Sequence, residues 1–148
     1  MTVETESSLR VSRVIEAAPE TVFRSWTVPS ELRQWSCPEG ASVEDAEVDL
    51  RVGGRYRIRM RGSEGRIHTA VGVYRNIERP RKLVYTWDWV EDDHRVGETL
   101  VTVEFLDRGE STEVVITHER FPTAEAKRAH EDGWKSCLNR LERRFEER

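Results

Sequence analysis

Apolar and polar residues alternate along most of this chain, and the alternation predicts a protein built mainly from strands. Residues 9–17 (LRVSRVIEA) carry apolar groups on both faces without a helical stripe, which favours a first strand. In residues 55–62 (RYRIRMRG), Tyr56, Ile58 and Met60 share one face, and arginines occupy the other. Further strands, separated by turn residues, are expected in residues 41–54, 65–78, 81–90, 98–106 and 111–119.

Two short helices are predicted between the first two strands, in residues 18–35. Pro19 suits the first turn of a helix, and the apolar residues up to Trp26 recur at helical spacing. Pro29 ends that run and begins a second helix, which carries Trp35. The order is therefore one strand, two short helices, six strands and a final segment.

That final segment, residues 123–146, predicts a long amphipathic helix. Its apolar stripe consists of His130, Trp134, Cys137, Leu138, Leu141 and Phe145. Gly133 lies inside the helix, where glycine costs about 1 kcal/mol relative to alanine. The close approach of another backbone or of a ligand would explain this glycine better than helix propensity does.

Together these elements indicate an α+β fold, in which a curved antiparallel sheet of about seven strands wraps around the long helix. Such a sheet seldom closes tightly on one helix, so we expect an apolar pocket between them. The alternative is that the same aromatic side chains fill a solid core. The residues expected to line the pocket are Trp35, Tyr56, Ile58, Met60, Tyr85, Trp87, Trp89, His118, Trp134, Leu138 and Leu141.

Length and charge limit the remaining possibilities. The 148 residues fit a single domain, here residues 9–148, with residues 1–8 disordered or extended. The net charge of −4 argues against binding to nucleic acid or to an anionic membrane, so the arginines of residues 55–61 are read as a solvent face. No apolar run suits a membrane helix, and the polar, acidic first ten residues do not resemble a signal peptide. We therefore expect a cytoplasmic protein without membrane insertion.

Few residues offer cofactor or catalytic chemistry. Cys37 and Cys137 lack the spacing of a metal or redox motif and are expected to be reduced thiols. The four histidines lie too far apart in sequence to form a metal-binding pair on one element. The stretch VGGRYR lacks the features of a phosphate-binding loop, and the acidic run at residues 91–93 is read as a solvated turn. No metal or other cofactor is expected.

Four patches of the chain resemble one protein family. They are APETVFRSWTVPSELRQW, VGGRYRIRM, ERPRKLVYTWDW and THERFPTAEAKRAHEDGWKSCLNRL. In this order they resemble the START-like (SRPBCC, helix-grip) superfamily, typified by the birch-pollen allergen. Within it they resemble the branch related to the C-terminal domain of the activator of the 90-kDa heat-shock-protein ATPase (AHSA-type). Asn76 departs from the family, whose members often carry a carboxylate there.

The resemblance implies an internal hydrophobic cavity, which the superfamily uses for lipids, sterols, polyketides and plant hormones. It implies no particular reaction. The leading hypothesis is a protein that binds a small hydrophobic or aromatic molecule, as a monomer or a homodimer. One alternative is a cofactor-independent enzyme of the cyclase, dehydratase or hydrolase type, using His118 with Tyr56 or Tyr85. Another is a chaperone cofactor, suggested only by the family name.

His118 and His130 each have a structural and a functional interpretation. His118 shares a strand face with apolar residues, so it is either a buried neutral imidazole that donates to a backbone carbonyl or a polar anchor in the pocket. His130 begins the helical stripe and either packs over a strand end or reaches the pocket mouth.

Overall fold

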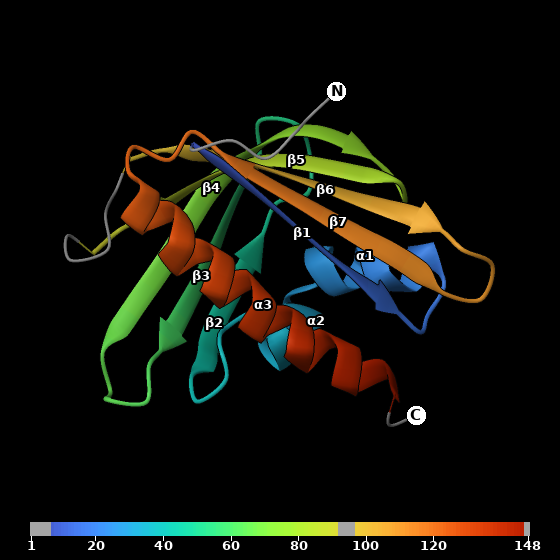
Figure 1. Ribbon diagram of the computed structural model, residues 1–148, viewed down its shortest axis with the longest axis horizontal. Coiled ribbons are helices and arrows are strands. Elements are labelled where there is room, and N and C mark those ends of the chain that lie inside the picture. The colour runs from blue at the N-terminus through green and yellow to red at the C-terminus, as the bar shows by residue number, and fades with distance from the viewer. Residues whose placement is uncertain (1–6, 92–96, 147–148) are drawn as a thin grey trace.

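A computed structural model of the protein describes residues 7–91 and 97–146 (Figure 1). It contains one seven-stranded antiparallel sheet in the order β1-β7-β6-β5-β4-β3-β2. The strands are β1 (Ser8–Ile15), β2 (Ser42–Val48), β3 (Arg55–Arg61), β4 (Ile67–Glu78), β5 (Lys82–Trp89), β6 (Thr99–Asp107) and β7 (Thr112–Glu119). The helices are α1 (Pro19–Thr27), α2 (Pro29–Trp35) and α3 (Ala124–Glu146). The predicted α+β helix-grip fold and its order of elements are confirmed.

Two segments of the sequence-based predictions fall partly outside the described residues. Residues 1–6 of the predicted N-terminal extension lie outside them, while Ser8 already begins β1. Residues 92–96, predicted as part of the turn between two strands, also lie outside them.

The two short helices connect opposite edges of the sheet. Because β1 and β2 are the outermost strands, the chain must cross the width of the sheet between them, and α1 and α2 make this crossing. Pro19 and Pro29 each stand in the first turn of a helix. Val28 between the helices has an extended backbone, as a residue before proline prefers, and so separates α1 from α2.

A β-bulge sets the faces of β2. The register shifts between Val43, opposite Met60, and Asp45, opposite Arg59. The extra residue restores the alternation, because Ala46 then lies opposite Ile58 on the inner face. Two consecutive acidic residues of β2, Glu44 and Asp45, therefore both lie on the outer face of the sheet.

Gly72 allows the sheet to pack tightly where it turns around the helix. It stands opposite Tyr56, and a Cβ atom here would lie 1.9 Å from the carbonyl oxygen of Thr86 and 2.6 Å from the Tyr56 ring. The Tyr56 hydroxyl donates a hydrogen bond of 2.6 Å to that same carbonyl. The missing side chain thus lets the Tyr56 ring cross β4 and reach β5.

Helix α3 lies along the concave side of the sheet, with β1 on one side and α2 on the other (Figure 1). Its buried residues are Ala126, Trp134, Cys137, Leu138, Leu141 and Phe145. They join the inner faces of the strands in one hydrophobic core. No helix within the described residues has both the length and the apolar character needed to cross a bilayer.

Candidate functional site

A cavity of about 450 Å³ lies between α3 and the part of the sheet formed by β3, β4 and β5. Tyr56, Ile58 and Met60 line it from β3. Helix α3 faces it with Gly133 and Trp134, among others. The cavity exists because rigid rings on the strands and on α3 leave the space beside Gly133 unfilled: a Cβ atom on this glycine would meet nothing within 4 Å. Among residues 7–91 and 97–146, no close approach of another backbone therefore explains Gly133.

Most of the sequence-predicted pocket residues meet at this cavity. Those that line it are Trp35, Tyr56, Ile58, Met60, Tyr85, Trp87, Trp89 and Trp134. His118, Leu138 and Leu141 are fully buried, and they belong to the surrounding structure and not to the cavity lining. Binding of a ligand by any of these residues stays a prediction.

Sequence reasoning missed part of the lining. Trp26 and Leu32, from α1 and α2, were placed on helices but not in the pocket. Tyr74 was missed because the strand at residues 65–78 was predicted without an assignment of its two faces. Cys137 was identified only as part of the helical stripe. The aromatic character of Trp26 and Tyr74 was the available signal in the sequence, because it could have suggested that they join the aromatic residues already predicted in the pocket.

Exposed residues mark the mouth of the cavity. On one side, Pro38, Glu39 and Gly40 come from the loop between α2 and β2. On the other, Ser63 and Glu64 come from the β3–β4 hairpin. Both segments are exposed to solvent, so entry between them needs no unfolding of the sheet.

Arg140 on α3 holds the loop that forms one side of this mouth. Its Nη1 atom donates to the Cys37 carbonyl oxygen at 3.3 Å and to the Ala41 carbonyl oxygen at 3.2 Å, and it lies 2.8 Å from the Cys37 Sγ atom. The backbone N–H of Glu39 donates to the Ser136 hydroxyl at 2.8 Å. Helix α3 therefore fixes the mouth loop as well as one wall of the cavity.

His118 is locked in a directed chain of hydrogen bonds. The Trp134 Nε1–H group donates to His118 Nδ1 at 3.0 Å, and an indole nitrogen can only donate, so Nδ1 must be the acceptor. The proton of the neutral ring is then on Nε2, which donates to Thr99 Oγ1 at 2.7 Å. Thr99 in turn donates to the Trp87 carbonyl oxygen at 3.0 Å. The predicted neutral imidazole therefore has a hydroxyl, not a backbone carbonyl, as its acceptor.

Burial lowers the pKa of His118 well below its ordinary value, and the neighbouring His130 lowers it further. Both ring nitrogens already have protein partners, and the ring has no exposed surface. His118 therefore holds the two tryptophans of the cavity wall in place and is badly placed to exchange protons with a bound molecule.

His130 reaches the cavity, as one of its two interpretations proposed. Its Nε2 atom accepts a hydrogen bond of 3.0 Å from Trp89 Nε1, and its Nδ1 atom lies 2.8 Å from the Ala126 carbonyl oxygen. Because the indole is the donor to Nε2, the remaining proton is on Nδ1 and points to Ala126. His130 thus positions Trp89 at the edge of the cavity.

Three tyrosines from neighbouring strands, Tyr56, Tyr74 and Tyr85, form a cluster in the wall. The Tyr56 and Tyr85 ring centroids are 5.2 Å apart, and those of Tyr74 and Tyr85 are 6.1 Å apart. Burial raises the pKa of each hydroxyl above the ordinary tyrosine value. The three hydroxyls are therefore neutral hydrogen-bonding groups at physiological pH.

The thiols offer no nucleophile. Burial raises the pKa of Cys37, although Arg140 partly offsets this effect. Burial also raises the pKa of Cys137, which lines the cavity. Both cysteines are free thiols in the structure and stay protonated near neutral pH. Within residues 7–91 and 97–146, no three His, Cys, Asp or Glu side chains converge to hold a metal ion.

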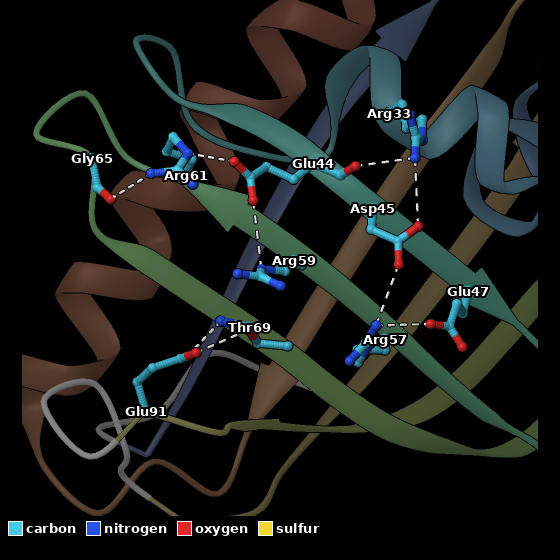
Figure 2. Close-up of polar contacts among 10 residues, drawn as sticks. All are labelled: Arg33, Glu44, Asp45, Glu47, Arg57, Arg59, Arg61, Gly65, Thr69 and Glu91. Carbon is cyan, nitrogen blue, oxygen red and sulfur yellow. Dashed lines mark hydrogen bonds and ion pairs between the residues drawn. The ribbon is translucent and has the colours of Figure 1, made fainter.

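The arginines of β3 lie on the opposite side of this strand, and acidic residues of β2 pair with them (Figure 2). Arg57 contacts Glu47 at 2.8 Å and Asp45 at 3.3 Å. Glu44 contacts Arg59 at 3.5 Å and also pairs with Arg61. The predicted solvent face is thus an exposed network in which β2 neutralises much of the positive charge.

Glu91, from the acidic run, is hydrogen-bonded to Thr69 near the start of β4 (Figure 2). Its carboxylate accepts hydrogen bonds from the Thr69 backbone N–H at 2.5 Å and from the Thr69 hydroxyl at 2.9 Å. Partial burial acts to raise the pKa of Glu91, but the Thr69 hydrogen bonds outweigh it, so the net shift is downward. The rest of this run, residues 92–93, lies outside the described residues.

The family profile described as Activator of Hsp90 ATPase homolog 1-like protein matches residues 16–146. The chain belongs to this family. A search of curated proteins finds no match.

Solved structures show the same fold. A protein of Chromobacterium violaceum is 26% identical and superposes with a TM-score of 0.86, with 96% of this chain and 99% of that chain covered. The AHSA1 protein of Silicibacter pomeroyi is 28% identical with a TM-score of 0.82, covering 93% of this chain and 96% of the other. A protein of Arthrobacter aurescens, at 21% identity, covers 97% of this chain and 88% of its own with a TM-score of 0.83. The family and its fold are therefore established for nearly the whole chain.

Proposed function

We propose that this family member binds a small, mostly apolar molecule in the cavity between α3 and the sheet. The observation that carries the proposal is the cavity of about 450 Å³, whose wall consists largely of aromatic and aliphatic side chains. Small-molecule sites are commonly concave, apolar and supplied with a few polar groups. The fold is compatible with this function, and lipids or polyketides are proposed ligand classes on the family resemblance alone.

The space beside Gly133 gives a direct test. N-phenyl-1-naphthylamine, a neutral probe whose fluorescence rises in apolar surroundings, is titrated into the wild type and into Gly133→Leu. Because nothing lies within 4 Å of a Cβ atom at this position, the leucine side chain starts in open space and occupies part of the cavity. We expect saturable binding by the wild type and at least about tenfold weaker binding by Gly133→Leu, since the probe and the leucine compete for one space.

Asp132→Leu is the matched control, because Asp132 is the preceding residue of α3 and is exposed. It adds the same side chain to the same helix but outside the cavity. Its probe affinity should equal that of the wild type, and thermal unfolding should show that both variants are folded. Absence of saturable binding in the wild type, or equal affinity in Gly133→Leu, would overturn the proposal.

The alternatives have less support. An enzyme using His118 needs a proton path between this ring and a pocket tyrosine, but the described hydrogen bonds of His118 go to Thr99 and Trp134. A chaperone cofactor rests on the family description only. A cytoplasmic location and a monomeric or homodimeric state stay predictions of the sequence.

A further inference from the structure

Three aromatic side chains of the cavity wall, Tyr74, Tyr85 and Trp87, carry donors that have no acceptor among the described residues. The Tyr85 hydroxyl oxygen accepts from Trp26 Nε1 at 3.2 Å, but its own proton has no acceptor among the described residues. Within the same residues, no hydrogen bond is made by the Tyr74 hydroxyl. Trp87 Nε1 is also buried without an acceptor in this part of the chain. Trp87 Nε1 and the Tyr85 hydroxyl are buried, and an unsatisfied buried donor is costly, so the lack of an acceptor for their protons among the described residues needs an explanation.

In the same cluster, the Tyr56 hydroxyl has a hydrogen-bond acceptor. Its proton goes to the Thr86 carbonyl oxygen at 2.6 Å. Tyr74 and Tyr85 line the cavity beside it, and within the described part of the chain neither hydroxyl proton has such an acceptor. Because burial raises the pKa of both hydroxyls, they keep their protons and remain donors at physiological pH.

The charges around the cavity disfavour an anion. No lysine or arginine is among the described residues that line it. The acidic side chains that line it, Glu39 and Glu64, are both exposed at the mouth. A carboxylate or phosphate entering this space would lose its hydration without gaining a lysine or arginine partner among the described lining residues.

We infer that the bound molecule is neutral and that a carbonyl or similar acceptor oxygen on its apolar body meets the hydroxyls of Tyr74 and Tyr85. This inference rests on the proposed function and specifies the chemical class of its ligand. The tyrosine rings and the surrounding tryptophans contact the apolar body, and the two donors fix its orientation.

Two probes of the same shape test the acceptor oxygen. Fluorenone and fluorene share a three-ring skeleton, but only fluorenone has a carbonyl group. Calorimetric affinities for both are measured with the wild type and with the double variant Tyr74→Phe/Tyr85→Phe. We expect the preference for fluorenone, expressed as the ratio of the two dissociation constants, to fall about 5- to 160-fold in the double variant, as the loss of two neutral hydrogen bonds predicts.

Tyr56→Phe is the matched control, because it removes a hydroxyl from the same cluster whose proton is already engaged by Thr86. The ratio should stay at its wild-type value in this variant. An unchanged ratio in the double variant would overturn the acceptor inference while leaving the proposed function intact. Failure of both probes to bind the wild type would instead count against the proposed function itself.

Two further measurements do not depend on the variants folding. The carbonyl stretch of ¹³C-labelled fluorenone bound to the wild type should lie below its frequency in cyclohexane, because a donated hydrogen bond weakens the C=O bond. An unshifted band would overturn the inference. Fluorene-9-carboxylate should bind at least about tenfold more weakly than fluorenone at pH 7.5, and tighter binding of this anion would overturn the neutral class.

Discussion

The two faces of β3, formed by alternating residues of one strand, differ in their surroundings and in their roles. On the outer face, Arg57 and Arg59 are about half exposed and pair with acidic residues of the adjacent β2. On the inner face, Tyr56 and Ile58 are 5% and 6% exposed and line a cavity. The outer face therefore depends on neighbours one strand away, whereas the inner face depends on residues from β4, β5 and all three helices.

The comparison shows where stability and specificity arise. Exposed ion pairs contribute between 0 and about 1 kcal/mol, because water screens them and long side chains lose freedom. Buried aromatic and aliphatic groups contribute about 2–5 kcal/mol each when they are packed. A conspicuous row of arginines is thus energetically minor, while the less conspicuous residues between them form the candidate site.

The largest effect is expected from an inner-face truncation, Trp134→Ala. The ring is 7% exposed, contacts Trp87 and donates to His118, so its loss should lower the free energy of unfolding by about 3–5 kcal/mol. Urea denaturation followed by circular dichroism measures this. A loss below about 1 kcal/mol would mean that the ring borders open space and adds little packing.

A pH titration distinguishes the inner face from the outer one. The pKa of folded His118 lies well below the ordinary value of 6.5, so the unfolded chain binds more protons once the pH falls below about 6.5. The contribution of His118 to the free energy of unfolding is therefore fully present above this pH. Below it, down to the pKa of folded His118, the free energy of unfolding falls by about 1.4 kcal/mol per pH unit.

Urea denaturation between pH 7.5 and 5.0 measures this slope, and His118→Gln should lack the part that His118 contributes. The carboxylates with lowered pKa values, Glu20, Glu39 and Glu91, start from 4.5 and affect stability only at lower pH. An identical slope in wild type and variant would contradict the assignment to His118.

Gly133→Ala should raise the free energy of unfolding, whereas Trp134→Ala should lower it. Alanine removes a helix penalty of about 1 kcal/mol, and its methyl group meets no atom within 4 Å. Thermal and urea unfolding should show a gain of up to this size. A destabilised variant would show that the cavity beside α3 is filled by protein atoms.

The smallest effect is expected from the outer face. Arg57→Gln with Arg59→Gln should change the free energy of unfolding by less than about 1 kcal/mol and should leave probe affinity within about twofold of wild type. Added salt should reduce the difference, since the pairs are exposed. A tenfold loss of affinity would instead identify the arginines as a partner surface.

Sequence patterns predicted the order of elements and the inward direction of most side chains, because both depend on local spacing. The period of two in β3 separated Tyr56 from Arg57, and the helical stripe placed Trp134 towards the sheet. However, periodicity predicts only which face of an element a residue lies on. It does not predict which residues of other elements that face contacts. Leu138 and Leu141 share the stripe of Trp134 but face packed core and not the cavity.

These missed features all depend on contacts between different elements of the fold. Arg140 binds the loop at Cys37, which is 103 residues earlier in the chain. His118 is held by Thr99 and Trp134, so its role as a positioning group depends on a strand and a helix that only the fold brings together. The ion pairs of β3 required the register of β2, including the bulge after Val43.

By itself, the sequence determined an α+β chain with an alternating, aromatic inner face, because hydrophobic periodicity is a local property of strands and helices. Only the tertiary structure decided that the rings border a cavity and that the Tyr74 and Tyr85 hydroxyls have no acceptor there among the described residues. The physical reason is that packing and hydrogen-bond satisfaction depend on three-dimensional neighbours, and here these come from strands and helices far apart in the chain.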